Sequence, residues 1–348
     1  MKDIYLIHQY YEPTHFKALY DCEENYDYRI KGFIILDKEE IIKRFARTFI
    51  KEKKIFISLK NLLIDIKNLF LLRFLRNKTL IVGIAPYDSL MNKYEDIFKR
   101  NNSIYFTSWQ FWDGNHFPRG KKENKDKFEY ALENSFKGAA CVSKLTQYYM
   151  KKFFQKTSVV NHAINVDKYR KKSKYSKSKK YLFLGSFDER KNVPLLIQWN
   201  NENNNFDYEF HFAGGGNLEK DVINLSLKNS KVKFLGRLSK GEIQEQLSEY
   251  DFLVLPSKEE PFGIVLLEAL AAGVPCIVSN SLGPREIIID NYNGYIFDLD
   301  NISMFKQVME KSFFISDDEY ERLINNALES SKQYDSVNLI NNWLTLIE

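Results

Sequence analysis

Short apolar runs alternate with longer segments of helical period along most of this chain. In the second half the apolar runs fall at 181–185, 208–213, 232–236, 252–256, 275–279 and 295–297. Helical patterns lie between them, for example at 192–199, 240–248 and 262–272. The run 252–255 is apolar without alternation, as expected for a strand covered on both faces. The pattern predicts β-α units around a parallel sheet.

The first half repeats this alternation less regularly, with predicted strands near 4–7, 79–84, 103–107 and 139–142. A Lys/Ser-rich run follows, without apolar period, and indicates a solvated connection. We therefore expect an α/β protein of two Rossmann-like, doubly wound domains facing across a cleft. The predicted boundaries are an N-terminal domain at 1–165, a basic linker at 166–180, a C-terminal domain at 181–334, and a terminal helix at 335–348 that is a candidate to cross back to the first domain.

Composition narrows the class of protein. The chain has 348 residues, so two domains of roughly 150 residues are expected, and its 44% hydrophobic residues exclude intrinsic disorder. Three scattered cysteines suit neither a disulfide framework nor a metal site. No apolar run is long enough to span a membrane, and the first residues lack signal-peptide architecture. We expect a soluble, cytoplasmic protein.

The charge is distributed unevenly along the chain. Residues 1–180 hold 37 Lys and Arg against 20 Asp and Glu, whereas residues 181–348 hold 14 against 26. Such asymmetry suggests that the first half faces a polyanion. No nucleic-acid motif accompanies the charge, so we expect no nucleic-acid partner. The anionic inner face of a membrane is the remaining candidate partner, which would make the protein peripheral.

The segment 53–78 allows two interpretations. Apolar residues keep helical spacing along it, and Lys53, Lys60 and Lys67 recur on another face. A basic amphipathic helix of this kind can lie on anionic lipid. It can equally cover the N-terminal sheet, and we favour the covering helix.

The segment 257–275 carries the clearest chemistry. A buried strand ends at Pro256, a polar turn follows, and a helix runs to Gly273, where Pro275 forbids continuation. The first N–H groups of this helix, near Gly263, lack intrahelical partners and lie at the carboxyl end of a parallel strand. Since Gly263 has no Cβ, a phosphate can approach this backbone closely.

Two carboxylates bracket the predicted phosphate site. Glu260 lies in the turn and Glu268 about a turn and a half inside the helix. Their spacing suits contacts with different portions of one extended ligand. Taken singly, each is better explained as a helix-stabilising acid or a surface residue. Together with Gly263 and the strand end they favour a ligand site.

This segment resembles the E-x(7)-E region of family-4 glycosyltransferases, which have the GT-B fold. Five further motifs follow the family's order. They are the interdomain strand and turn at 159–169, the loop Leu184-Gly-Ser-Phe-Asp-Glu-Arg-Lys-Asn192, the glycine-rich segment 212–216, Val232-Lys-Phe-Leu-Gly-Arg237, and Ser281-Leu-Gly-Pro-Arg-Glu286. The likeness covers most of residues 159–297.

The resemblance implies a nucleotide-sugar site. By similarity Lys191 neutralises the donor diphosphate, Glu260 contacts hydroxyls of the transferred sugar, and Glu268 accepts hydrogen bonds from the ribose. By the same similarity, hydrogen bonds to the phosphate come from the backbone N–H groups of Gly263, Ile264 and Val265. Lys191 and Glu260 are the residues we expect to carry catalysis.

The resemblance also implies that main-chain groups near Arg237 and Leu238 frame the base. One family position is filled differently here. Many members carry Arg where this chain has Ser186. Arg190 is a candidate replacement for that second phosphate cation, and an Arg pointing at solvent is the alternative.

The resemblance implies transfer with retention of anomeric configuration and without a metal or other cofactor. Asp298-Leu-Asp300 matches the D-x-D pattern of metal-dependent transferases, but a solvated turn is the favoured interpretation. Gly214-Gly215-Gly216 could cradle a phosphate, and a flexible turn is the favoured alternative.

The N-terminal half is expected to bind the acceptor. Its segment 103–116 is a strand that runs into an aromatic and polar loop. Trp109, Trp112 and His116 are candidates to stack on or bond to an acceptor sugar, and core packing of the tryptophans is the alternative.

The sequence thus predicts a retaining glycosyltransferase that moves a sugar from a nucleoside diphosphate, with a UDP-sugar favoured, to a glycan or lipid-linked acceptor. Synthesis of a cell-surface polysaccharide would suit such chemistry. Two alternatives stay open: a nucleotide-sugar epimerase of the same fold, and a non-catalytic module that binds sugar nucleotides. The intact set of Lys191, Glu260 and Glu268 weighs against the module.

Overall fold

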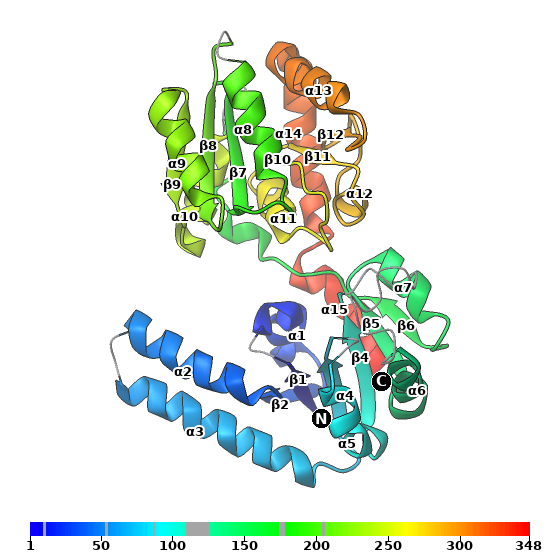
Figure 1. Cartoon of the computed structure of the whole chain (residues 1–348). Coiled ribbons are helices and arrows are strands. Elements are labelled where there is room, and N and C mark those ends of the chain that lie inside the picture. Colours follow the sequence, from blue (N-terminus) through cyan, green and yellow to red (C-terminus); the bar gives the residue numbers. More distant parts are fainter. Residues whose placement is uncertain (10–11, 53–54, 86–87, 109–124, 174–177, 204–205) are drawn as a thin grey trace. The chain divides into compact units, whose positions relative to one another are not determined.

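The computed structural model describes residues 1–9, 12–52, 55–85, 88–108, 125–173, 178–203 and 206–348. These residues form two compact units, one of Met1–Ala163 with Leu339–Glu348 and one of Ile164–Asn338. Each unit is built on one six-stranded sheet whose strand pairs are parallel. Helices flank both sheets (Figure 1). The predicted α/β class is confirmed.

The sheet of the first unit has the order β2-β1-β3-β4-β5-β6. The order reverses between β1 and β3, so their carboxyl ends form the switch point at which such sheets bind ligands. Its strands are β1 (Lys2–His8), β2 (Tyr28–Ile35), β3 (Thr79–Gly83), β4 (Asn102–Thr107), β5 (Gly138–Cys141) and β6 (Thr157–Val159).

Helices of very different lengths connect these strands. The longest two, α2 and α3, lie between β2 and β3 and run side by side (Figure 1). The helices of this unit are α1 (Lys17–Asp21), α2 (Lys38–Glu52), α3 (Ile55–Leu71), α4 (Leu90–Lys93), α5 (Glu95–Lys99), α6 (Lys125–Ser135) and α7 (Lys144–Met150), with short 3-10 turns at Pro13–Phe16, Glu23–Asn25 and Leu72–Phe74.

The second unit has the strand order β12-β11-β10-β7-β8-β9. Its strands are β7 (Lys180–Ser186), β8 (Glu209–Gly215), β9 (Val232–Gly236), β10 (Phe252–Leu255), β11 (Cys276–Ser279) and β12 (Gly294–Phe297). Its helices are α8 (Val193–Glu202), α9 (Glu219–Lys228), α10 (Lys240–Gln246), α11 (Ile264–Ala271), α12 (Pro284–Ile287), α13 (Ile302–Phe314) and α14 (Asp317–Lys332), with 3-10 turns at Val166–Lys168 and Leu247–Glu249.

Aromatic side chains fill the core of the second unit. The rings of Tyr181, Phe210 and Phe252 stack across three neighbouring strands, with centroid distances of 6.2 and 6.0 Å. Trp199 of α8 and Phe313 of α13 stack at 5.9 Å on the same sheet. This apolar layer fixes the register of the strands, since a slip of one residue would move every ring to the other face of the sheet and break the stack.

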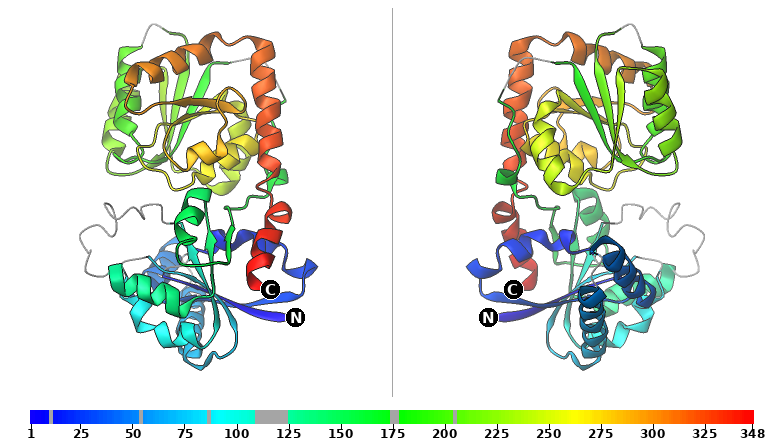
Figure 2. Two further views of the ribbon diagram at one scale, coloured as in Figure 1. Left: turned by 90° about the vertical axis from the view of Figure 1, so that its right-hand side faces the viewer. Right: turned by 90° about the vertical axis from the view of Figure 1, so that its left-hand side faces the viewer.

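The last helix, α15 (Ser336–Ile347), ends within the first unit. Trp343 is 1% exposed and stacks on Phe106 of β4 at 6.0 Å. The Asn342 side chain donates to the carbonyl of Val159 at 2.9 Å. Figure 2 shows this helix beside the N-terminal strand from two sides.

The Lys/Ser-rich run is not uniformly solvated. Lys172 is 9% exposed, and its Nζ lies 3.2 Å from Oδ1 of Asp251 and 2.8 Å from the carbonyl of Tyr250. Burial lowers the pKa of Lys172, and Asp251 opposes that shift. The expectation of a solvated connection is therefore wrong at Lys172, because a buried carboxylate supplies the partner that its ammonium group needs.

Candidate functional site

The central candidate site lies where β10 ends and α11 begins. Gly263 caps α11 with a φ of 95°, and a Cβ at this position would lie 3.0 Å from Cδ1 of Leu266. Only glycine adopts this conformation without strain. The N–H groups of Ile264 and Val265 open the helix and have no partner one turn earlier. A helix start of this kind favours an anionic ligand.

Lys191 and Glu260 form an ion pair beside this turn. The ammonium group of Lys191 contacts Oε2 of Glu260, and the two side chains are 12% and 9% exposed. The Glu260 side chain also packs against Gly263, since a Cβ there would lie 3.4 Å from Glu260 Cγ. The structure thus brings the predicted cation, carboxylate and helix start together, in a half-buried setting that strengthens their electrostatic interactions.

Hydrogen bonds within the β7–α8 loop hold Lys191 in place. Asp188 accepts from the backbone N–H of Lys191 at 2.8 Å and from the Ser186 hydroxyl at 2.7 Å. Burial acts to raise the pKa of Asp188, but these hydrogen bonds and the nearby cations prevail and lower it. Ser186 therefore orients the loop that carries the cation.

Arg190 joins this loop to the one that carries Glu260. Its guanidinium is 43% exposed and donates to the carbonyl of Glu259 at 3.2 Å. The Arg190 carbonyl in turn accepts from the backbone N–H of Lys258 at 2.9 Å. Arg190 therefore lies beside the site and does not extend freely into solvent.

A third loop, between β11 and α12, contacts the backbone of Glu260. The backbone N–H of Gly283 donates to the carbonyl of Glu260 at 3.1 Å. A Cβ on Gly283 would lie 2.4 Å from that same oxygen. This close approach explains why glycine occupies position 283, and it fixes the turn that positions the carboxylate.

Glu268 lies further along α11 and has a partner that the sequence did not reveal. Its Oε1 accepts from the Tyr169 hydroxyl at 2.9 Å. Burial raises the pKa of Glu268, while the tyrosine hydrogen bond opposes the shift. Tyr169 therefore orients a carboxylate that is half-buried. The place of Tyr169 at the end of the predicted interdomain turn was the available signal.

Arg237 follows β9 and reaches the end of β8. A Cβ on Gly215 would lie 3.1 Å from Nε of Arg237 and 2.7 Å from a carboxylate oxygen of Glu219. Leu238 comes next, just before the Ser239 capping box of α10. A Cβ on Gly216 would lie 2.5 Å from the Phe187 carbonyl. The glycine run thus allows close packing on the β7–α8 loop.

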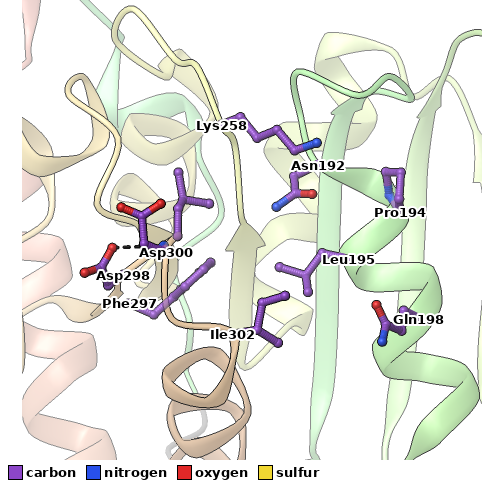
Figure 3. Close-up of a pocket in the computed structure, with 10 residues that line it drawn as sticks. Asn192, Pro194, Leu195, Gln198, Lys258, Phe297, Asp298, Asp300 and Ile302 are labelled. Carbon is purple, nitrogen blue, oxygen red and sulfur yellow. Dashed lines mark hydrogen bonds between the residues drawn. The ribbon is translucent and has the colours of Figure 1, made fainter.

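The Asp298-Leu-Asp300 segment lines a separate hollow of about 530 Å³ between α8 and α13 (Figure 3). Asp298 accepts from the Asn280 side chain at 2.8 Å and from the backbone N–H of Asp300 at 3.1 Å. Both bonds are those of a structured turn. Within the described ranges no three His, Cys, Asp or Glu residues are grouped so as to hold a metal ion.

The predicted acceptor residues Trp109, Trp112 and His116 lie outside the described residues. Other histidines gather at the carboxyl edge of the N-terminal sheet. The His15 ring lies 5.2 Å from His8 and 5.0 Å from His162 between ring centroids. Burial lowers the pKa of His162 to about 3. Burial also lowers the pKa of His15, so His15 and His162 are both held neutral in this cluster.

Sequence reasoning missed this histidine cluster because its members are far apart along the chain. His8 ends β1, His15 lies in a 3-10 turn and His162 follows β6. A Cβ on Gly83 would lie 2.4 Å from the His8 ring, so the glycine at the end of β3 makes room for it. A polar residue at the end of a predicted strand was the one local signal.

Comparison with known proteins finds a sequence family that the second unit resembles. Residues 165–330 match the model of the glycosyl transferases group 1 family. The chain is 31% identical over 211 residues to an uncharacterized glycosyltransferase of Methanocaldococcus jannaschii, covering 60% of this chain and 58% of that protein. It is 32% identical over 142 residues to the N,N'-diacetylbacillosaminyl-diphospho-undecaprenol alpha-1,3-N-acetylgalactosaminyltransferase of Campylobacter jejuni, covering 40% and 36%. The alignments therefore span less than two thirds of either relative.

Solved structures establish the fold of the whole chain. Anabaena HepE in complex with UDP has a TM-score of 0.74 at 14% identity, with 99% of this chain and 98% of that chain covered. The lipopolysaccharide outer core galactosyltransferase WaaB has a TM-score of 0.70 at 16% identity, with 99% of each chain covered. The chain has the GT-B fold, and the resemblance noted in its sequence is confirmed.

Proposed function

We propose that this chain is a glycosyltransferase that moves a sugar from a nucleoside diphosphate donor to a glycan or lipid-linked acceptor, with retention at the anomeric carbon and without a metal ion. One observation carries the proposal. Lys191, Glu260 and the start of α11 meet at the carboxyl edge of the sheet in the unit that matches the family.

The chemistry of the donor suits these groups. In the transfer, the bond between the anomeric carbon and the diphosphate oxygen breaks, and a bond to the acceptor oxygen forms. The nucleoside diphosphate leaves with the bonding electrons, and the acceptor releases a proton. Negative charge therefore grows on the leaving phosphate, where the Lys191 ammonium and the N–H groups of Ile264 and Val265 stabilise it.

The ion pair prepares the site for this charge. Glu260 neutralises Lys191 through this ion pair. When the diphosphate takes over Lys191, the Glu260 carboxylate becomes available to accept hydrogen bonds from sugar hydroxyls. Donor binding and carboxylate release are thus coupled, and neither charge is left unpaired in a largely buried place.

The donor nucleotide is proposed to be UDP. Anabaena HepE, which shares the fold, binds UDP and UDP-glucose. In this chain Glu268, oriented by Tyr169, suits the hydroxyls of a ribose. Main-chain groups next to Arg237 and Leu238 are proposed to frame the base.

The acceptor is proposed to be a growing cell-surface glycan or its lipid-linked precursor. Two relatives are named for acceptors on diphosphoundecaprenol, the Campylobacter jejuni enzyme and an Escherichia coli galactosyltransferase. The excess of 17 positive charges in residues 1–180 suits an acceptor that carries a diphosphate and an anionic inner membrane face. Trp109, Trp112 and His116 remain candidates for acceptor contacts.

The test is transfer from radiolabelled UDP-sugars to a lipid extract that contains diphosphoundecaprenol-linked sugars. We expect a labelled lipid product from the wild-type chain and a loss of at least a hundredfold in rate for Glu260→Gln, the size expected for one transition-state contact. Glu245→Gln on exposed α10 is the matched control. Interconversion of UDP-sugars without transfer would indicate an epimerase, and nucleotide binding without turnover would indicate a binding module.

A further inference from the structure

Helix α3 has one buried stripe that packs into the fold and a second, apolar stripe that is exposed. Ser58, Asp65 and Leu72 recur every seven residues from α3 into the adjoining turn and are buried. At 100° per residue these positions share a stripe that faces the interior. Asp65 accepts from the Arg44 guanidinium of α2 at 2.6 Å, which fastens the two helices together.

An apolar stripe lies roughly a third of a turn around the same helix from the buried one. Leu59, Leu63, Ile66 and Phe70 follow the i, i+4, i+7 and i+11 spacing and are 43%, 67%, 52% and 58% exposed. Phe74 extends the stripe beyond the helix and is 65% exposed. An ordinary covering helix is polar on its outer side, so this stripe needs an explanation beyond the fold.

Basic side chains flank the exposed stripe. Lys60 and Lys67 are exposed, and each directly follows a residue of the stripe in the sequence. Among the described residues neither forms an ion pair. Residues 38–78 together hold 12 Lys and Arg against 4 Asp and Glu. The α2–α3 surface is therefore both apolar and strongly cationic.

A shallow groove beside the stripe has the same character. It encloses about 570 Å³ between α2, α3 and the α4–α5 segment. Its floor is formed by apolar side chains such as Ile66, Leu69 and Phe70, and its polar lining is Lys38, Arg73 and Lys93 with the Tyr94 ring. Apolar surface bordered by cations suits an amphiphile with a negative head group.

We propose that the α2–α3 surface binds an anionic lipid bilayer, with α3 lying in the plane of the interface. The stripe Leu59–Leu63–Ile66–Phe70 enters the boundary between head groups and acyl chains, while Lys60 and Lys67 contact lipid phosphates. No helix within the described ranges is long and apolar enough to cross a membrane, so the contact is peripheral.

Charge decides between a bilayer and a second copy of the chain. A symmetric dimer through this surface would place like charges from two copies opposite each other, which costs stability. A bilayer of anionic lipid neutralises the same charges. The inference stands on the α2–α3 surface alone, and it specifies the membrane contact that the proposed function includes.

The experiment is flotation of the full chain with vesicles, in the absence of any donor. One set contains phosphatidylcholine alone and the other equal parts of phosphatidylcholine and phosphatidylglycerol. We expect binding to the anionic vesicles, with little to the neutral ones, and weakening with added salt. Lys60→Gln with Lys67→Gln should lower the partition coefficient about 30-fold, as expected for two basic residues at the surface.

A second variant tests the apolar stripe. Leu63→Glu with Phe70→Glu should lower binding to anionic vesicles more than tenfold and leave Tm close to that of the wild type, because both side chains are exposed. Leu227→Glu with Phe314→Glu, at residues 79% and 74% exposed in the second unit, is the matched control and should bind normally.

Three outcomes would overturn the proposal. The first is a wild-type chain that does not bind anionic vesicles. The second is a stripe variant that binds as well as its control. The third is a wild-type dimer in sedimentation that the stripe variant converts to monomer without any change in vesicle binding. Donor binding stays measurable in every variant, so failure here is distinguishable from failure of the transferase proposal.

Discussion

At the scale of single residues, the ion pair of Lys191 with Glu260 explains how the protein keeps two charges in a largely buried place. Each partner compensates the cost of removing the other from water. Hydrogen bonds of Asp188 and Arg190 in the β7–α8 loop and of Gly283 in the β11–α12 loop position the pair. Replacing either charge is therefore expected to change ligand binding more than it changes the backbone.

The positive φ of Gly263 gives the first prediction. Gly263→Ala should destabilise the protein by about 1–2 kcal/mol, because alanine is strained in the left-handed region. It should also weaken nucleotide binding, since the N–H groups of α11 would shift. Urea unfolding and titration calorimetry measure the two effects. Gly241→Ala in α10, where a Cβ meets nothing within 4 Å, is the control and should be neutral or slightly stabilising.

The buried His162 gives a prediction about pH. Burial holds the pKa of His162 at about 3 in the folded protein, against an ordinary value of 6.5. Below pH 6.5 the unfolded chain binds a proton that the folded chain excludes, so stability is complete above that pH and falls as the pH is lowered toward 3. The loss at pH 5 should be about 2 kcal/mol. Urea unfolding at pH 7 and at pH 5 measures this loss of stability.

His162→Gln removes this titration and should reduce the difference in stability between pH 7 and pH 5. The variant is compared with its own value at pH 7, which corrects for any lost packing. An unchanged pH dependence would show that His162 is already protonated in the folded state or that other groups dominate.

At the scale of elements, Asp251 ties the start of the second unit to its sheet. It accepts from the Tyr320 hydroxyl at 2.7 Å and from the backbone N–H groups of Ser178 and Lys180 at 2.8 and 3.0 Å, and it pairs with Lys172. A single buried carboxylate thus fixes the strand β7, helix α14 and the segment that enters the unit.

Asp251→Ala should therefore lower the free energy of unfolding by about 3–5 kcal/mol, because Lys172 would remain buried without its counter-charge. Thermal and urea unfolding test this value. Glu249→Ala removes the exposed partner of Lys180 and is the control, with an expected loss below about 1 kcal/mol. Equal losses in both variants would contradict the role assigned to Asp251.

The sequence predicted the elements of the second unit well because its strands are unbroken apolar runs, such as 252–255, separated by clear turn residues. It did not predict β2, whose first residues Tyr28-Arg-Ile-Lys mix charge into an edge strand, or β6, which has three residues. The turn at Gly263 was predictable from local chemistry. The Lys191–Glu260, Glu268–Tyr169 and His8–His15–His162 contacts were not, because they depend on the packing of distant segments.

The α3 segment shows the same limit. Its apolar spacing predicted one lipid-facing or one sheet-facing stripe, and we favoured the second. In the structure Asp65 and Leu72 face inward while Leu63 and Phe70 face outward. Periodicity alone could not separate two stripes on a helix that is apolar around most of its circumference.

At the scale of the whole molecule, the C-terminal helix contributes to the unit that contains the N-terminus. Trp343→Ala should destabilise that unit by about 3–5 kcal/mol, since a fully buried aromatic side chain is lost from contacts with Phe16 and Phe106. Hydrogen exchange followed by mass spectrometry should show faster exchange in β1 and β4. Val337→Ala, at a residue 63% exposed, is the control. Unchanged exchange in both strands would contradict this role for α15.

The central claim is a diphosphate site built from Lys191 and the start of α11. The most direct measurement is thermal unfolding with UDP, GDP, ADP, CMP and dTDP, for the wild type, Lys191→Ala and the exposed control Lys220→Ala. At a hundred times its dissociation constant one nucleotide, expected to be UDP, should add about 2.7 kcal/mol of stability to the wild type and the control. The same nucleotide should add little to Lys191→Ala. Equal stabilisation of all three proteins, or of none by any nucleotide, would contradict the account.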